Sequence, residues 1–309
     1  MAGTATRRPA AEWSATIALR GAGGEPIDLR RTVDGHGLNT LPPMAPDPDQ
    51  RGFGIVLSMP RGRPLAVRVR EETKGQIRVK APANSAARRR AALDGVRHVL
   101  RLDEDLSGFY ERVLADEDLS WACTGAGRMM RSQTVFEDVV KTICTTNCAW
   151  SGTVRMVNGL VDGLGEAAVG GGHAFPTAAA MAAASDAFYA DEVRAGYRGP
   201  YLRALADDVA GGKLDLEAWA AAPRSELPDE ELEQRLLALA GVGPYAAAHI
   251  MMLMGRHSRL ILDSWTRPTY AKLRGRKQTD QQILRRFKRY GDHAGLAFWL
   301  TLTRSWVAD

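Results

Sequence analysis

The chain has 309 residues, of which 45% are hydrophobic and 25% charged, and its formal net charge is +5. This composition predicts a folded protein of two or three domains rather than a disordered chain, and no apolar run approaches the ~20 residues of a membrane span. The three cysteines (Cys123, Cys144 and Cys148) offer no paired secretory framework and no charged-then-apolar leader opens the chain, so a reduced, cytoplasmic protein is expected.

Residues 1–12 are predicted to be a flexible tail and residues 13–100 an antiparallel sheet domain. Apolar and polar residues alternate in short runs separated by turns that contain glycine or proline, as in half-buried strands. These runs are residues 13–20, 53–59, 65–69 and 76–79.

From Ala86 the spacing of apolar residues becomes helical and stays so to the end of the chain. Residues 101–309 are therefore expected to be all helical, with a glycine-rich break at 163–172 and a packed helix over the alanine-rich stretch 178–184. The predicted fold class is α+β, mainly α.

Residues 229–255 are predicted to form two helices joined by a tight turn. Three acids follow Pro228, where the helix dipole favours them, and the turn Gly241-Val242-Gly243-Pro244 combines glycines that permit positive φ with a proline suited to a helix start. Free N–H groups at such a start bind phosphate without a charged side chain. The predicted phosphate-binding residues are Gly241, Val242, Gly243, Tyr245 and Ala246.

Positive charge is concentrated in two segments. Residues 61–101 contain twelve Lys or Arg and three acids, and residues 267–290 contain nine Lys or Arg and one acid. An isolated basic run is as often a solvated surface as a binding face, but two runs together with a phosphate-binding hairpin predict a positive face for nucleic acid.

Four ordered segments resemble the helix-hairpin-helix DNA glycosylases, the superfamily that includes 8-oxoguanine glycosylase and 3-methyladenine glycosylase II. They are residues 102–160, residues 196–216, the hairpin, and the sequence LILDSW that contains Asp263. The resemblance covers residues 100–309 well and the amino-terminal third only in outline. It implies an antiparallel sheet domain followed by an all-helical glycosylase core at 101–309.

The resemblance places the catalytic aspartate of the family at Asp263. Cleavage of an N-glycosidic bond passes through a state with oxocarbenium character, which a nearby carboxylate stabilises. On spacing alone, an aspartate before Ser-Trp is more often the N-cap of a helix, so both roles are open here.

Bifunctional family members carry a lysine where this chain has Tyr245. Without that amine no Schiff base to the sugar forms, so the resemblance implies a monofunctional enzyme that leaves an abasic site uncut. Tyr245 is either part of a base-stacking pocket or a core tyrosine.

The resemblance also supplies candidates for base eversion and base binding. Asn147 is at the position of the asparagine that fills the gap in the duplex, and Trp150 could stack near the opening or anchor the turn. Phe298 and Trp299 lie in the segment that closes the base pocket, unless they are plain core. Phe298 replaces a glutamine that reads 8-oxoguanine, which favours alkylated purines, because cationic bases stack well on aromatic faces.

The expected function is a base-excision-repair DNA glycosylase for an alkylated purine, acting on double-stranded DNA as a monomer in the cytoplasm, at the nucleoid. The alternatives are a glycosylase for an oxidised or deaminated purine and a non-catalytic DNA-binding protein. No cysteine follows Cys148, which excludes the iron–sulfur cluster of the endonuclease III branch. No metal is expected, although a monovalent cation at the hairpin is compatible with the family.

Overall fold

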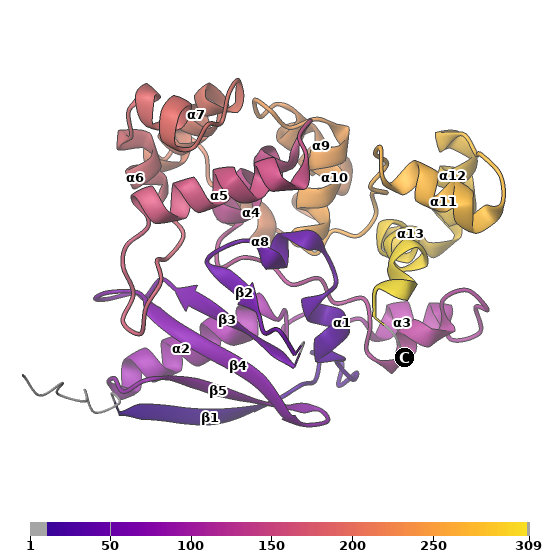
Figure 1. The fold of residues 1–309 in the computed structure, drawn as a ribbon. Coiled ribbons are helices and arrows are strands. Elements are labelled where there is room, and N and C mark those ends of the chain that lie inside the picture. Colours follow the sequence, from indigo (N-terminus) through magenta and orange to yellow (C-terminus); the bar gives the residue numbers. More distant parts are fainter. Residues whose placement is uncertain (1–10, 50, 308–309) are drawn as a thin grey trace, which may run out of the picture.

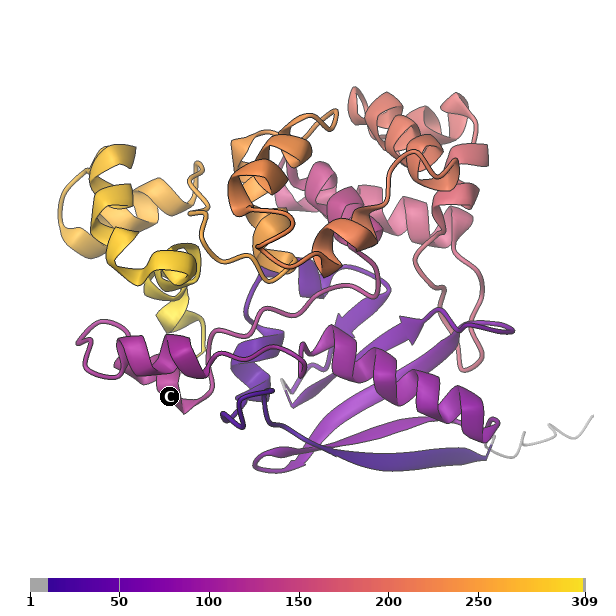
Figure 2. The same ribbon diagram turned by 180° about the vertical axis from the view of Figure 1, so that it is seen from behind.

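The computed structural model describes residues 11–49 and 51–307. Residues 1–10 of the predicted tail lie outside the described residues, and Glu12 already belongs to the first strand. The chain forms an antiparallel sheet covered on one face by a helix, with a larger helical part above it (Figures 1 and 2). None of the described helices is long and apolar enough to cross a membrane.

The sheet has five strands in the order β1-β5-β4-β3-β2. Across it, Phe53 pairs with Val69 and Val69 with Val79, and all three side chains are fully buried. Buried and more exposed residues alternate along β1, β4 and β5, as the sequence predicts. Of the five strands, only the three-residue β2 was not predicted. The strands are β1 (Glu12–Ala18), β2 (Met44–Pro46), β3 (Gly52–Leu57), β4 (Leu65–Thr73) and β5 (Gln76–Pro82), and the covering helix is α2 (Ala86–Val99).

The helical part contains two apolar cores. One is formed by α4, α5, α7, α9 and α10, and the other by α3 and α11 to α13, with α10 contributing side chains to both. The helices are α3 (Ser107–Val113), α4 (Val135–Thr145), α5 (Trp150–Leu164), α6 (Ala178–Ala183), α7 (Arg198–Ala210), α8 (Leu216–Ala221), α9 (Asp229–Leu237), α10 (Pro244–Leu253), α11 (Thr266–Arg274), α12 (Asp280–Phe287) and α13 (Ala294–Thr303).

The glycine-rich break begins two residues later than predicted, because α5 continues to Leu164. The loop that follows runs back to the sheet (Figure 1), where Val169 N–H donates to the carbonyl of Pro64 at 2.8 Å and Val169 O accepts from Ala66 N–H at 2.9 Å. Two short helices of the sheet domain lie next to the helical part. They are α1 (Leu29–Val33) and the 3-10 helix η1 (Gly37–Thr40).

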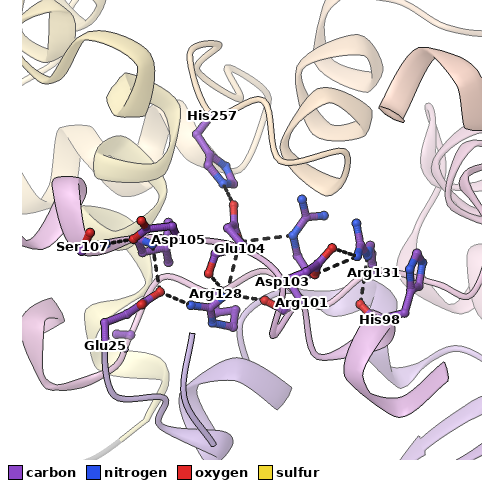
Figure 3. A network of polar contacts seen from close by, with 12 residues as sticks. Glu25, His98, Arg101, Asp103, Glu104, Asp105, Ser107, Arg128, Arg131 and His257 are labelled. Atoms are coloured by element: carbon purple, nitrogen blue, oxygen red, sulfur yellow. Dashed lines mark hydrogen bonds and ion pairs between the residues drawn. The ribbon is translucent and has the colours of Figure 1, made fainter. Parts of the chain in front are cut away.

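A buried ionic network joins the sheet domain to both helical cores (Figure 3). The Arg128 side chain is completely buried, donates to Glu25 Oε1 at 2.5 Å and also reaches the carbonyl of Arg101. Glu104 accepts from Arg101 at 3.2 Å and contacts His257 Nε2 at 2.6 Å. Arg101 in turn donates to the carbonyl of Leu253, the last residue of α10. The network therefore fixes where α10 lies relative to the sheet.

Stability is expected to depend on pH through Glu104. Burial alone would raise the pKa of Glu104, but the guanidinium charges of Arg101 and Arg128 and the contact with His257 lower it below its usual range. A lowered folded-state pKa stabilises the fold above the unfolded value of about 4.3, and this contribution is lost as the pH falls through the folded value.

We expect Glu104→Gln to lower the free energy of unfolding at pH 7 by about 3–5 kcal/mol, because it leaves buried arginine charge uncompensated. The variant should also lose less stability than the native chain as the pH falls below 4. Urea unfolding measured across this pH range checks both expectations. Glu111→Gln, at an exposed position of α3, is the control. Equal pH slopes for the native chain and Glu104→Gln would contradict this account of the network.

Candidate active site

A cavity of about 1110 Å³ lies where the two helical cores meet. Its walls come from η1, the turn between α4 and α5, the first turns of α10, the connection from α10 to α11, and α13. Most of the predicted catalytic, wedge and base-pocket residues line this one cavity, although they are far apart in sequence. These residues are Asn147, Trp150, Tyr245, Asp263 and Trp299.

Asp263 contacts the start of α11 and also lines the cavity. Its Oδ1 accepts from the N–H groups of Trp265 at 2.8 Å and Thr266 at 2.6 Å, and its own N–H donates to Thr266 Oγ1 at 2.8 Å. It therefore caps the start of α11, as the spacing indicated. Asp263 also lines the cavity, and no donor from the described residues bonds to its Oδ2. One oxygen fixes the carboxylate and the other is left for a ligand.

The helix-hairpin-helix turn forms as predicted. Gly241 adopts φ +85°, and a Cβ there would lie 2.9 Å from Tyr201 Cδ2, so both the conformation and the space require glycine. The first hydrogen bond of α10 runs from Ala247 N–H to the carbonyl of Gly243 at 2.9 Å. The N–H groups of Gly243, Tyr245 and Ala246 come before this hydrogen bond in the chain. These three residues border a hollow of about 220 Å³.

Val242 differs from its prediction as a phosphate-binding residue. Its N–H donates to the carbonyl of Leu239 at 3.1 Å, and its side chain is buried in the first helical core. The N–H group is used to close the turn and is not directed to a ligand. Val242 therefore stabilises the hairpin through its N–H bond to Leu239 and its buried side chain.

Asn147 lies between the hairpin hollow and the cavity and lines both. It is exposed, in a left-handed conformation with φ +47°, and its Nδ2 donates to the hydroxyl of Tyr197 at 3.3 Å. Tyr197 is 51% exposed and was not predicted. Trp150 begins α5 and lines the cavity with 44% of its surface exposed, and its ring lies against Gly37 of η1.

One wall of the cavity is aromatic. The rings of Trp265, Trp299 and Trp306 lie 5.5–5.7 Å apart, and all three tryptophans line the cavity. Tyr245 lines it from α10, with its hydroxyl 3.2 Å from Thr145 Oγ1, and burial raises the pKa of that hydroxyl. The tyrosine therefore stays neutral at physiological pH. The sequence did not reveal Trp265 or Trp306, because tertiary packing alone brings them to this wall.

Phe298 was predicted to line the base pocket, and the structure corrects this. Its side chain is fully buried in the second core, 5.1 Å from the ring of Phe287 and 5.6 Å from that of Tyr270. Successive residues of an α-helix point about 100° apart, so Trp299 turns to the cavity while Phe298 turns away.

Among the described residues that line the cavity there is no lysine. Lys141 is fully buried with its Nζ 2.6 Å from Glu137 Oε1. Lys272 is on the exposed side of α11 and does not line the cavity. Within residues 11–49 and 51–307 no cluster of three or more His, Cys, Asp or Glu could hold a metal ion.

Arginines of both basic segments contact acceptors of the protein itself, and in the second segment Arg274 and Arg286 pair with Asp118. In the first, Arg88 donates to the carbonyls of Arg61 and Arg63 at 2.5 and 2.6 Å, and α2, which carries Arg88, lies on the face of the sheet seen in Figure 2. The second segment contains a groove of about 670 Å³ at the far end of α11, the helix whose start lines the cavity. Four arginines line this groove: Arg274, Arg276, Arg285 and Arg286.

No protein-family model and no curated protein matches the chain. Among solved structures, it is similar to MBOgg1 in complex with a DNA ligand, with a TM-score of 0.72 at 19% identity over 95% of this chain and 96% of that one. It is also similar to the 3-methyladenine DNA-glycosylase from Archaeoglobus fulgidus, with a TM-score of 0.72 at 20% identity over 96% and 100% of the two chains. The chain has the fold of the helix-hairpin-helix DNA glycosylases.

A third solved structure with the glycosylase fold is the Clostridium acetobutylicum 8-oxoguanine glycosylase/lyase, with a TM-score of 0.70 at 20% identity over 95% of this chain and 98% of that one. The glycosylase fold thus accounts for nearly the whole chain, including the amino-terminal sheet that the sequence matched only in outline.

The corrected place of Phe298 predicts a clear difference between two aromatic truncations. Phe298→Ala should lower the free energy of unfolding by about 3–5 kcal/mol, because it opens a void in a fully buried cluster. Trp306→Ala, at a side chain that is 41% exposed, should cost well under half of that. Urea unfolding at pH 7 measures both free energies. Equal losses of unfolding free energy in the two variants would contradict the buried position of Phe298.

Proposed function

We propose that this chain is a DNA glycosylase of base excision repair that hydrolyses the N-glycosidic bond of a damaged purine turned out of duplex DNA. The observation that carries the proposal is the position of Asp263 in a cavity that has an aromatic wall and that shares Asn147 and Tyr245 with the hairpin hollow. A phosphate at the free N–H groups of Gly243, Tyr245 and Ala246 would hold the backbone of the nucleotide whose base enters the cavity.

In the proposed reaction the bond between C1′ and the purine nitrogen breaks, and its electron pair leaves with the base. Positive charge grows on the sugar, where the Asp263 carboxylate stabilises it. A water oxygen then bonds to C1′ and its proton passes to the carboxylate or to solvent. Because Oδ1 is held by two backbone N–H groups, the carboxylate is fixed before the charge develops.

The reaction is proposed to be monofunctional, with an alkylated purine as the favoured substrate. The absence of lysine from the lining residues supports water rather than an amine as the nucleophile. The wall of Trp265, Trp299 and Trp306 supports an electron-poor base, which stacks favourably on indole faces. No cofactor is proposed.

Double-stranded DNA containing the damaged base is the proposed partner, bound by a monomer in the cytoplasm, at the nucleoid. The groove of four arginines at the far end of α11 supports contact with the backbone beside the lesion, since helix α11 connects that groove to the cavity. Asn147 is proposed to fill the space left by the everted base, with the exposed Tyr197 beside it.

Asp263→Asn tests the proposed chemistry directly. An asparagine oxygen can still accept from the N–H groups of Trp265 and Thr266, so the cap of α11 is retained while the charge is removed. We expect base release from methylated duplex DNA to fall at least about a hundredfold, with duplex affinity changed by less than about threefold. Single-turnover base release and fluorescence anisotropy measure the two quantities.

The control for this test is Asp186→Asn, which removes an exposed carboxylate that pairs with Arg203 of α7 and does not line the cavity. Its base release should stay within about threefold of the native chain. A native chain that binds duplex DNA but releases no base from methylated, oxidised or deaminated duplexes would favour the non-catalytic binding protein. Release of 8-oxoguanine alone would favour the oxidised-purine enzyme.

Borohydride trapping tests the monofunctional assignment. Because no lysine is among the described residues that line the cavity, no covalent protein–DNA adduct should form during base release, and the product strand should stay intact until it is treated with alkali. Denaturing gels of the protein and of the labelled strand report both results. A borohydride-dependent adduct would show that an amine outside the lining residues reaches C1′.

A further inference from the structure

His249 is a polar residue of the cavity that the proposed mechanism does not use. It lies one helical turn after Tyr245 on α10, and its ring is 5.9 Å from the Tyr245 ring and 6.3 Å from that of Trp299. The side chain is only 7% exposed, yet it lines the cavity. Its place in the cavity wall is not evident from the sequence, because a histidine within an apolar helix is usually a core residue.

His249 differs from the other buried polar side chains of the cavity wall. Thr153 donates its hydroxyl proton to the carbonyl of Cys144 at 3.0 Å, and Trp299 donates its Nε1 proton to the carbonyl of Gly35 at 2.8 Å. His249 makes no hydrogen bond with any described residue: its Nδ1 is buried without a partner, and its Nε2 is not among the enclosed atoms. Nε2 is therefore the ring nitrogen open to the cavity.

The tautomer of the His249 ring follows from the free-energy cost of burying Nδ1 without a partner, which differs between the protonated and the bare nitrogen. An unpaired N–H is rarer in protein interiors than an unpaired acceptor, which favours the proton on Nε2 and a bare Nδ1. His36 shows the same choice in this molecule, since its Nε2 bonds to the carbonyl of Met130 at 2.8 Å while its Nδ1 is buried and unpaired. Burial lowers the pKa of His249 to about 3, so the ring is neutral at physiological pH.

We propose that His249 is a specificity-determining residue whose Nε2–H donates a hydrogen bond to the exocyclic oxygen of the bound base, so that the site prefers 6-oxo purines, such as 7-methylguanine, over 6-amino purines. The inference rests on the proposed glycosylase function and deepens it. A 6-oxo group accepts the bond, whereas a 6-amino group presents its own hydrogens to the same donor. A neutral donor also adds no positive charge against a cationic alkylated base.

The test compares two bases released from one substrate. Duplex DNA treated with dimethyl sulfate contains both 7-methylguanine and 3-methyladenine, and chromatography of the released bases gives the rate for each. His249→Leu removes the donor and should lower 7-methylguanine release about tenfold more than 3-methyladenine release. His249→Gln, which keeps an N–H donor, should restore at least part of the preference.

Unchanged base ratios in a folded, active His249→Leu chain would overturn the inference, as would a native chain that releases only 3-methyladenine. A native chain that releases no base from any damaged duplex would instead overturn the proposed function. A readout independent of turnover is the ¹⁵N shift of the His249 ring in the full chain, which should show the neutral Nε2–H form at pH 7. A protonated Nδ1 there would also overturn the inference.

Discussion

The arrangement of the molecule depends on one buried set of charges, centred on Arg128 and Glu104. A buried arginine needs acceptors for its donors, and both terminal nitrogens of Arg128 find them in segments far apart in the sequence. Because Arg101 reaches the last residue of α10, the same network that attaches the sheet also sets the position of the central helix. The cavity exists because α10 is held between two cores.

The sequence was sufficient for much of the fold because its patterns are local. Alternating residues gave four of the five strands, and the glycine turn with its acidic helix start gave the hairpin. The three-residue β2 and the return of Val169 to the sheet depend on contacts with β3 and β4 and leave no periodic signal.

The side chains of the site were predictable only where a motif fixed their direction. Asp263 follows the hairpin in a set order, and it lines the cavity. Phe298 and His249 lie on helices whose side chains are buried on every side, so the spacing of apolar residues does not indicate which face turns to the cavity. For that reason Phe298 was assigned wrongly and His249 was missed.

The position of Gly243 and His249 on one helix bears on how a product would leave. Gly243, the N-cap of α10, and His249 are six positions apart, which is about 9 Å of helical rise, so the proposed phosphate site and the proposed base contact keep a constant separation. On that proposal a whole nucleotide would engage both, whereas a base cut from its sugar would retain only the second contact. Cleavage itself would thus weaken the hold on the base.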